Sequence, residues 1–150
     1  MEWNDAVEEL QGSFALWSLF VSAFVSATLA PGGSEALLAY LAHSAEHDAR
    51  VLLLTATLGN TLGAVTTWLL GLLAAIRYPA DRLAETRGRQ QAVASVKRWG
   101  VFILLLSGLP VVGDGFCFAA GWLRLSFWRS LIAMALGKGL RYAAIVYAFA

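Results

Sequence analysis

One element occurs twice in this sequence, and each copy interrupts a strongly apolar stretch. The first copy, Pro31-Gly-Gly-Ser-Glu35, is followed by Leu58-Gly-Asn-Thr-Leu-Gly63, and the second copy, Pro110-Val-Val-Gly-Asp114, is followed by Leu136-Gly-Lys-Gly-Leu-Arg141. In each copy an acid stands four residues after a proline. Internal symmetry with Pro/Gly-interrupted hydrophobic segments at matching positions is typical of repeat-built membrane carriers, whose sites lie near the bilayer midplane. The repeat therefore predicts two related halves within a membrane.

The composition also indicates a membrane protein. Hydrophobic residues make up 59% of the 150 residues and charged residues 14%, whereas a soluble domain has roughly 25% charged residues. We expect a single membrane domain over residues 1–150, with one repeat at about 14–76, a basic connector at 77–100 and a second repeat at about 101–150. Residues 1–11 carry acids and no Lys or Arg. They lack the basic region of a signal peptide, so we expect the first apolar stretch to be retained.

The distribution of charge favours one topology for the apolar stretches at residues 14–42, 51–76, 101–123 and 130–150. Four plain spanning helices would place the basic connector on the side of the acidic N-terminus, opposite Arg124 and Arg129. The positive-inside rule instead places basic groups together in the cytoplasm. If the two proline-broken stretches enter the membrane and return, only 51–76 and 130–150 cross it. Both basic groups then lie inside, with both termini outside.

The predicted fold class is therefore an all-α integral membrane protein, an inverted repeat of two halves. Each half would consist of a re-entrant broken helical hairpin and a transmembrane helix. Non-helical backbone at membrane depth must be buried in protein or face water, so we expect the two hairpins to face each other. The residues that we expect to form the hairpin breaks are Pro31, Gly32, Gly33, Pro110, Gly113 and Gly115.

The connector allows two interpretations. Residues 80–100 place apolar side chains among basic ones, which would suit a short helix lying on an anionic leaflet. A solvated loop whose charges only fix the topology fits the same residues. The charged side chains of the connector are Arg77, Asp81, Arg82, Glu85, Arg87, Arg89, Lys97 and Arg98.

Five polar residues within the apolar stretches are the candidate site, namely Glu35, Asn60, Asp114, Lys138 and Arg141. A charge in a membrane-spanning helix costs at least ~2.5 to 3.5 kcal/mol on insertion scales, so such residues pair or face water and mark functional sites. We expect the two acids to carry protons, the two bases to hold a lipid head group, and the amide to line the path. The alternative is a set of structural ion pairs. Gly59 and Gly63, spaced as GxxxG, predict close helix packing.

A rival motif points to an enzyme. His43-Ser-Ala-Glu46-His47 fits H-x-x-E-H, in which two His bind zinc and Glu acts as base. It lies in a short joint between apolar stretches and has no evident third ligand, so we expect no metal, cofactor or catalytic residue. No Walker loop, nucleophile elbow or nucleic-acid surface occurs. The expected partners are membrane lipids, anionic or phosphate-bearing. A non-transporting structural role and assembly into a homo-oligomer stay open.

Six segments of the sequence are informative in combination. They are Ser26-Ala-Thr-Leu-Ala-Pro-Gly-Gly-Ser-Glu35, Thr55-Ala-Thr-Leu-Gly-Asn-Thr-Leu-Gly-Ala64, Lys97-Arg-Trp-Gly100, Leu109-Pro-Val-Val-Gly-Asp114, Ala120-Gly-Trp122 and Leu136-Gly-Lys-Gly-Leu-Arg-Tyr142. Together they resemble the DedA family of membrane proteins (the SNARE-associated or VTT-domain superfamily), especially its short YqaA-like branch. The resemblance implies opposed re-entrant hairpins, a bacterial inner-membrane location, and movement of undecaprenyl phosphate or phospholipids between leaflets, linked to the proton motive force. Many relatives carry arginines where this sequence has Ser107 and Gly113.

Overall fold

The computed structural model describes residues 2–28, 33–78, 87–109 and 112–149. The elements in these ranges are all helices: α1 (Glu2–Thr28), α2 (Gly33–Ser44), α3 (Ala49–Arg77), α4 (Arg87–Trp99), the 3₁₀ helix η2 (Gly100–Gly108), α5 (Val112–Trp122) and α6 (Phe127–Phe149). The predicted all-α class is confirmed. Three predicted hairpin breaks, Pro31, Gly32 and Pro110, lie outside the described residues, as do Asp81, Arg82 and Glu85 of the connector.

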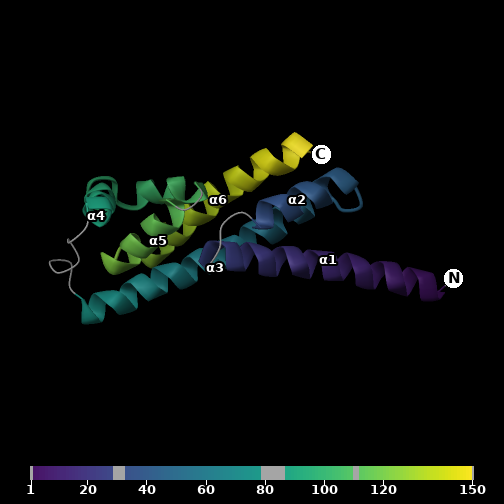
Figure 1. The fold of residues 1–150 in the computed structure, drawn as a ribbon, viewed down its shortest axis with the longest axis horizontal. Helices are drawn as coiled ribbons and strands as arrows, with labels where there is room; N and C mark the ends of the chain where they lie inside the picture. The colour runs from purple at the N-terminus through teal and green to yellow at the C-terminus, as the bar shows by residue number, and fades with distance from the viewer. Residues whose placement is uncertain (1, 29–32, 79–86, 110–111, 150) are drawn as a thin grey trace.

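The helices form an elongated bundle in which the chain doubles back at the middle of the molecule between α1 and α2 and again between η2 and α5 (Figure 1). α1 runs from the N-terminal end toward the middle of the molecule, and α2 returns toward the end from which α1 came. α3 then runs to the opposite end. From there η2 leads back to the middle, α5 returns, and α6 runs toward the end that holds the N-terminus. Both termini and the α2–α3 joint therefore lie toward one end, and α4 and the α5–α6 turn toward the other.

The lengths of the helices separate them into two groups. α1, α3 and α6, with 27, 29 and 23 residues, reach ~34 to 43 Å at 1.5 Å per residue, which exceeds a hydrocarbon core of ~30 Å. By length and composition these three helices could each cross a membrane. α2, η2 and α5 have 12, 9 and 11 residues and reach only ~16 to 18 Å. α1 is thus a third long helix beyond the two spans that the sequence predicted.

Glycines bring the long helices into backbone contact. A side chain at Gly59 or Gly63 of α3 would collide with the backbone of α1, so the predicted close packing of this GxxxG pair is confirmed. Gly71 of α3 and Gly121 of α5 each lie against the other helix's backbone. Small residues permit such close approach, which is a main source of helix association where water supplies no hydrophobic driving force.

Two apolar clusters lie at the two ends of the bundle. One joins α1, α2, the beginning of α3 and the end of α6, around Leu38, Leu52 and Tyr142. The other joins the end of α3 to α4, η2, α5 and the beginning of α6, around Leu104 and Met134. Each cluster surrounds one doubled-back pair, α1–α2 or η2–α5. The polar side chains of the candidate site lie on α2, α3, α5 and α6.

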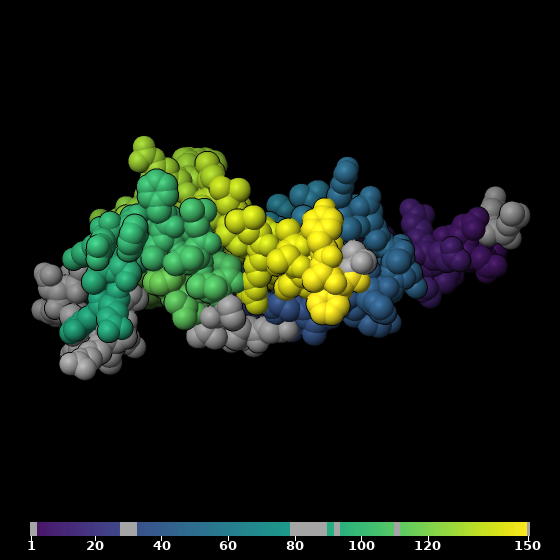
Figure 2. All heavy atoms as spheres, turned by 90° about the horizontal axis from the view of Figure 1, so that it is seen from above, coloured from purple at the N-terminus to yellow at the C-terminus, as the bar shows by residue number. Residues whose placement is uncertain are grey.

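The connector is helical from residue 87, so it is more than a loop. Within α4, Val96 is fully buried against the second cluster, while Lys97 and Arg98 are exposed. Trp99 is exposed, and the Arg98 guanidinium lies 5.5 Å from its ring centroid. In Figure 2, α4 lies at the end of the molecule opposite the projecting N-terminal part of α1. Contact of α4 with a leaflet stays a prediction.

The close contact between α3 and α5 requires a residue without a side chain at position 121, and this requirement can be tested by substitution. A Cβ at Gly121 would overlap the carbonyl oxygen of Trp68, so Gly121→Ala should separate the two helices and lower stability by about 1 to 3 kcal/mol, as overpacking does elsewhere. The measurement is the thermal unfolding midpoint of the purified protein in detergent. Gly115→Ala is the matched control in the same helix, because nothing lies within 4 Å of its added Cβ. Equal midpoints for the two variants would contradict the described packing.

Candidate functional site

The two predicted acids begin the two short helices that return from the middle of the bundle. Glu35 lies in the first turn of α2 and Asp114 in the first turn of α5. The partially positive helix N-terminus favours a carboxylate at such positions. Local sequence explains the placement, because each acid follows the proline-containing break by a few residues and so enters the helix at its first turn. The two acids thus occupy equivalent positions in the first turns of α2 and α5.

Both acids pair with the same helix. The Nζ atom of Lys138 lies 3.4 Å from Oδ1 of Asp114, and Nη2 of Arg141 donates to Oε1 of Glu35. Lys138 and Arg141 stand three residues apart on α6, so they are neighbours on its surface. One helix therefore receives an acid from each half of the chain. The structure brings together the four charged residues that the sequence singled out.

The two pairs differ in their access to solvent or lipid. The side chain of Lys138 is 3% exposed, and that of its partner Asp114 is 28% exposed. Arg141 and Glu35 are 24% and 19% exposed. A buried cation without a partner is far more costly than one that can still reach water. Lys138 consequently depends on Asp114 more strictly than Arg141 depends on Glu35.

A hydroxyl network beside the Glu35–Arg141 pair was not anticipated from the sequence. Ser34 Oγ lies 2.8 Å from the Tyr142 hydroxyl, and both side chains are fully buried. The Ser34 amide also donates to Oγ of Ser26 at 3.3 Å. The only signal in the sequence was adjacency, since Ser34 precedes Glu35 and Tyr142 follows Arg141. This network fixes the start of α2 against both α1 and α6, and with it the position of Glu35.

Asn60 ties α3 to α1. Its Nδ2 donates to the carbonyl oxygen of Ala23 at 2.8 Å, and the residue is 3% exposed. Its Oδ1 has no partner within the described part of the chain, and neither have the hydroxyls of Thr57 and Thr61 on the same helix face. Oε2 of Glu35 is likewise buried without a partner there. These buried oxygen atoms could accept hydrogen bonds from a bound ligand.

The predicted break glycines that the structure describes have different surroundings. Gly113 packs against the backbone of Ser107, and the nearest group to Gly33 is Oγ of Ser22 on α1, at 3.7 Å. Gly115 has open space around it. Instead of a glycine contact, the pairing of Glu35 and Asp114 with α6 links α2 and α5. The role of these glycines as breaks of re-entrant hairpins stays a prediction.

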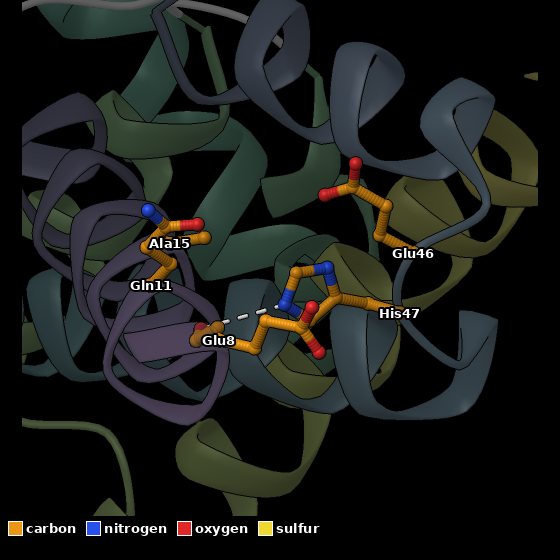
Figure 3. Close-up of a pocket in the computed structure, with 6 residues that line it drawn as sticks. Glu8, Gln11, Ala15, Glu46 and His47 are labelled. Atoms are coloured by element: carbon orange, nitrogen blue, oxygen red, sulfur yellow. Dashed lines mark hydrogen bonds between the residues drawn. The ribbon is translucent and has the colours of Figure 1, made fainter. Parts of the chain in front are cut away.

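Two residues of the rival zinc motif, Glu46 and His47, line a pocket beside α1. α2 ends at Ser44 and Ala45 has a φ of 54°, so His43 and His47 do not share one helix face as H-x-x-E-H requires. Figure 3 shows Glu46 and His47 facing Glu8 and Gln11 of α1. These side chains line a pocket of about 560 Å³, where Nε2 of His47 lies 3.4 Å from the Gly12 carbonyl oxygen. No group of three His, Cys, Asp or Glu side chains in the described ranges could hold a metal ion.

Long apolar helices around a centre of paired charges define this chain as a multi-pass α-helical membrane protein. Comparison with curated proteins agrees. The chain is 43% identical over 136 residues to inner membrane protein YqaA of Escherichia coli and equally to that of Shigella flexneri, covering 91% of this chain and 92% of each relative. An uncharacterized protein of Haemophilus influenzae is 40% identical over 140 residues, covering 89% of this chain and 86% of that protein.

The chain belongs to the DedA family, in its YqaA-like branch, and is a multi-pass protein of the bacterial inner membrane. A scan against protein-family models found no match, and no solved structure matches the chain. The predicted family and location are confirmed.

Because the two ion pairs differ in burial, we expect replacement of the acid to lower stability more in one pair than in the other. Asp114→Asn leaves the buried Lys138 ammonium unpaired, which should cost about 3 to 5 kcal/mol, as for other broken buried pairs. Glu35→Gln should cost less, because Arg141 is partly exposed. The measurement is the yield of monodisperse protein in fluorescence-detected size-exclusion chromatography. Adding Lys138→Met to Asp114→Asn should restore the yield, and equal yields for the two single variants would refute this ranking.

Proposed function

We propose that this protein moves a phosphate-bearing lipid, undecaprenyl phosphate or a phospholipid, between the leaflets of the inner membrane, coupled to protons. The observation that carries the proposal is the pairing of an acid from each half with Lys138 and Arg141 on α6. Charged residues within apolar segments are costly and are retained mainly where a membrane protein handles ions or charged substrates. A guanidinium or an ammonium suits a phosphate, and a carboxylate suits a proton.

The proposed membrane placement is an inverted repeat with two re-entrant hairpins, α1–α2 and η2–α5. Three observations support it. The elements α2, η2 and α5 are too short to cross ~30 Å of hydrocarbon. The chain doubles back at the middle of the bundle in both halves (Figure 1). Arg77, Arg124 and Arg129 lie toward the end of the bundle that also holds α4, which agrees with the positive-inside rule if that end is cytoplasmic.

In the proposed mechanism, the proton and the phosphate exchange partners at one ion pair. When Glu35 takes up a proton, its carboxyl becomes neutral and no longer holds the Arg141 guanidinium by charge. The lipid phosphate then becomes the anionic partner of Arg141. Release of the proton on the other side of the membrane restores the carboxylate, which competes with the phosphate for Arg141 and favours its departure. Proton binding and phosphate binding thus strengthen each other, and by linkage the coupling acts equally in both directions.

The second pair has a different part in the proposal. Because Lys138 is nearly fully buried, Asp114 is needed to keep it paired in every state that lacks a bound anion. Asp114 is partly exposed and can exchange a proton in the same way as Glu35 once a phosphate stands near Lys138. Two anion positions along one face of α6 would allow a head group to pass from one cation to the next. Asn60 lines this interior from α3.

The proposed topology can be tested by chemical labelling. In a Cys117→Ala background, single cysteines replace Glu9, Ser44 and Ala94, all exposed residues. A membrane-impermeant maleimide should label positions 9 and 44 from the periplasmic side, and position 94 only after the membrane is opened. Four plain spans would instead put positions 9 and 94 on the same side. Labelling of those two from one face of the membrane would overturn the re-entrant arrangement.

The proposed transport is tested by a leaflet-resolved assay in proteoliposomes. Fluorescent phospholipid or radiolabelled undecaprenyl phosphate should change leaflets, and an imposed pH gradient should change the rate by about fivefold or more, the low end of typical coupling between sites. Glu35→Gln fixes the neutral carboxyl and should abolish the response to the gradient while the protein stays folded. Glu9→Gln, the same chemical change at an exposed acid, should keep the response.

Two results of this assay would count against the proposal. Transfer no faster than in protein-free liposomes, for all the lipids tried, would exclude translocation. An unchanged response to the gradient in Glu35→Gln would exclude this carboxyl as the proton carrier while leaving translocation in place.

A further inference from the structure

A groove leads along η2 and α6 to one of the two cations. It lies between these helices and has a volume of about 260 Å³. Its lining residues are Leu105, Leu106, Gly108, Leu109, Gly137 and Arg141. Apart from Arg141, every lining side chain is a leucine or is absent because the residue is glycine. An apolar groove with an arginine in its lining matches the chemistry of a lipid chain attached to an anionic head group.

The floor of the groove is backbone. A Cβ at Gly108 would meet the carbonyl oxygen of Gly137, and a Cβ at Gly137 would meet that of Leu105. η2 and α6 therefore touch through their main chains, and no side chain rises from the crossing. Leu105, Leu106 and Leu109 are 41%, 46% and 49% exposed. Their side chains are thus open to the surrounding lipid, which lets a hydrocarbon chain enter sideways.

Arg141 retains donors for a ligand in the groove. A guanidinium carries five N–H donors in a planar fork, and the described contact with Glu35 involves Nη2. The Arg141 side chain is partly exposed, and its Cβ lies 3.3 Å from the position of a Cβ built on Gly108. The base of this side chain therefore stands directly over the glycine floor. A phosphate oxygen can be bound there by paired, charge-assisted hydrogen bonds.

We propose that one lipid with a phosphate head group occupies this groove during transfer, its chain along the three leucines and its phosphate on Arg141. The inference rests on the proposed function and names the place at which the substrate is held. A side chain at Gly108 or Gly137 would part the two helices that form the groove. Undecaprenyl phosphate and a phospholipid share this chemistry, and the experiment below separates them.

The test places a photoreactive diazirine amino acid at Leu106 in the groove and, as a matched control, at Leu62, an exposed leucine on α3. Each protein is reconstituted with equal amounts of undecaprenyl phosphate and undecaprenol or, in a second arm, of phosphatidylglycerol and diacylglycerol. Lipid adducts are counted by mass spectrometry after irradiation. At Leu106 the phosphate-bearing member should exceed its neutral counterpart by about tenfold, because charge-assisted hydrogen bonds favour it. At Leu62 the two should react equally.

A double variant, Glu35→Gln with Arg141→Gln, removes the guanidinium without leaving an unpaired charge and should abolish the enrichment at Leu106. Its size-exclusion profile checks that it folds. Equal adduct ratios at Leu106 and Leu62 in both arms would overturn the inference, as would an enrichment that survives the double variant. The leaflet assay on the same preparations distinguishes the two proposals. Lipid transfer without enrichment at Leu106 would overturn the groove inference and leave the proposed function standing. Enrichment at Leu106 without lipid transfer would support lipid binding in the groove and overturn the proposed translocation.

Discussion

The high free energy of an unpaired charge in hydrocarbon governs the arrangement of this molecule. Four ionised side chains lie on elements of the bundle interior, and each can remain there only with a partner of opposite charge. The partners come from the beginnings of α2 and α5 on one side and from successive turns of α6 on the other. Both short helices are consequently held at a defined position along α6. The glycine crossings and apolar clusters then complete the packing around these pairs.

The two pairs share a pattern, and their surroundings set them apart. Lys138 is enclosed, and its ammonium is bound to a single carboxylate at 3.4 Å. Arg141 lines an apolar groove, and Glu35 follows Ser34, whose hydroxyl lies 2.8 Å from that of Tyr142. The Lys138–Asp114 pair is therefore more costly to open than the Glu35–Arg141 pair, whose two side chains are both partly exposed. The two ion pairs are thus similar in composition and differ in how easily their partners can be separated.

Much of this site could be predicted from the sequence because a charge within an apolar stretch is rare and costly. Glu35, Asp114, Lys138 and Arg141 stood out on that ground, and the repeated proline–acid element indicated that the acids were equivalent. Which acid meets which base could not be predicted, since both bases lie on one face of α6 and the depth of each hairpin decides the register. Ser34 and Tyr142 escaped notice because hydroxyl groups carry no comparable penalty in an apolar segment. The 3₁₀ form of η2 likewise has no signal in its run of apolar residues.

The backbone contacts made by glycine also determine which parts can shift relative to one another. α1 is joined to α3 at Gly59 and Gly63, α5 to α3 at Gly71 and Gly121, and η2 to α6 at Gly108 and Gly137. Main chains in such contact move as rigid units, since sliding would force carbonyl groups past each other. Gly33, the described glycine of α2, makes no such backbone contact. The nearest group to a Cβ built there is the hydroxyl of Ser22. The position of α2 therefore depends on side-chain contacts, those of Ser34 with Ser26 and Tyr142 and of Glu35 with Arg141, and such contacts can exchange partners without moving one main chain past another.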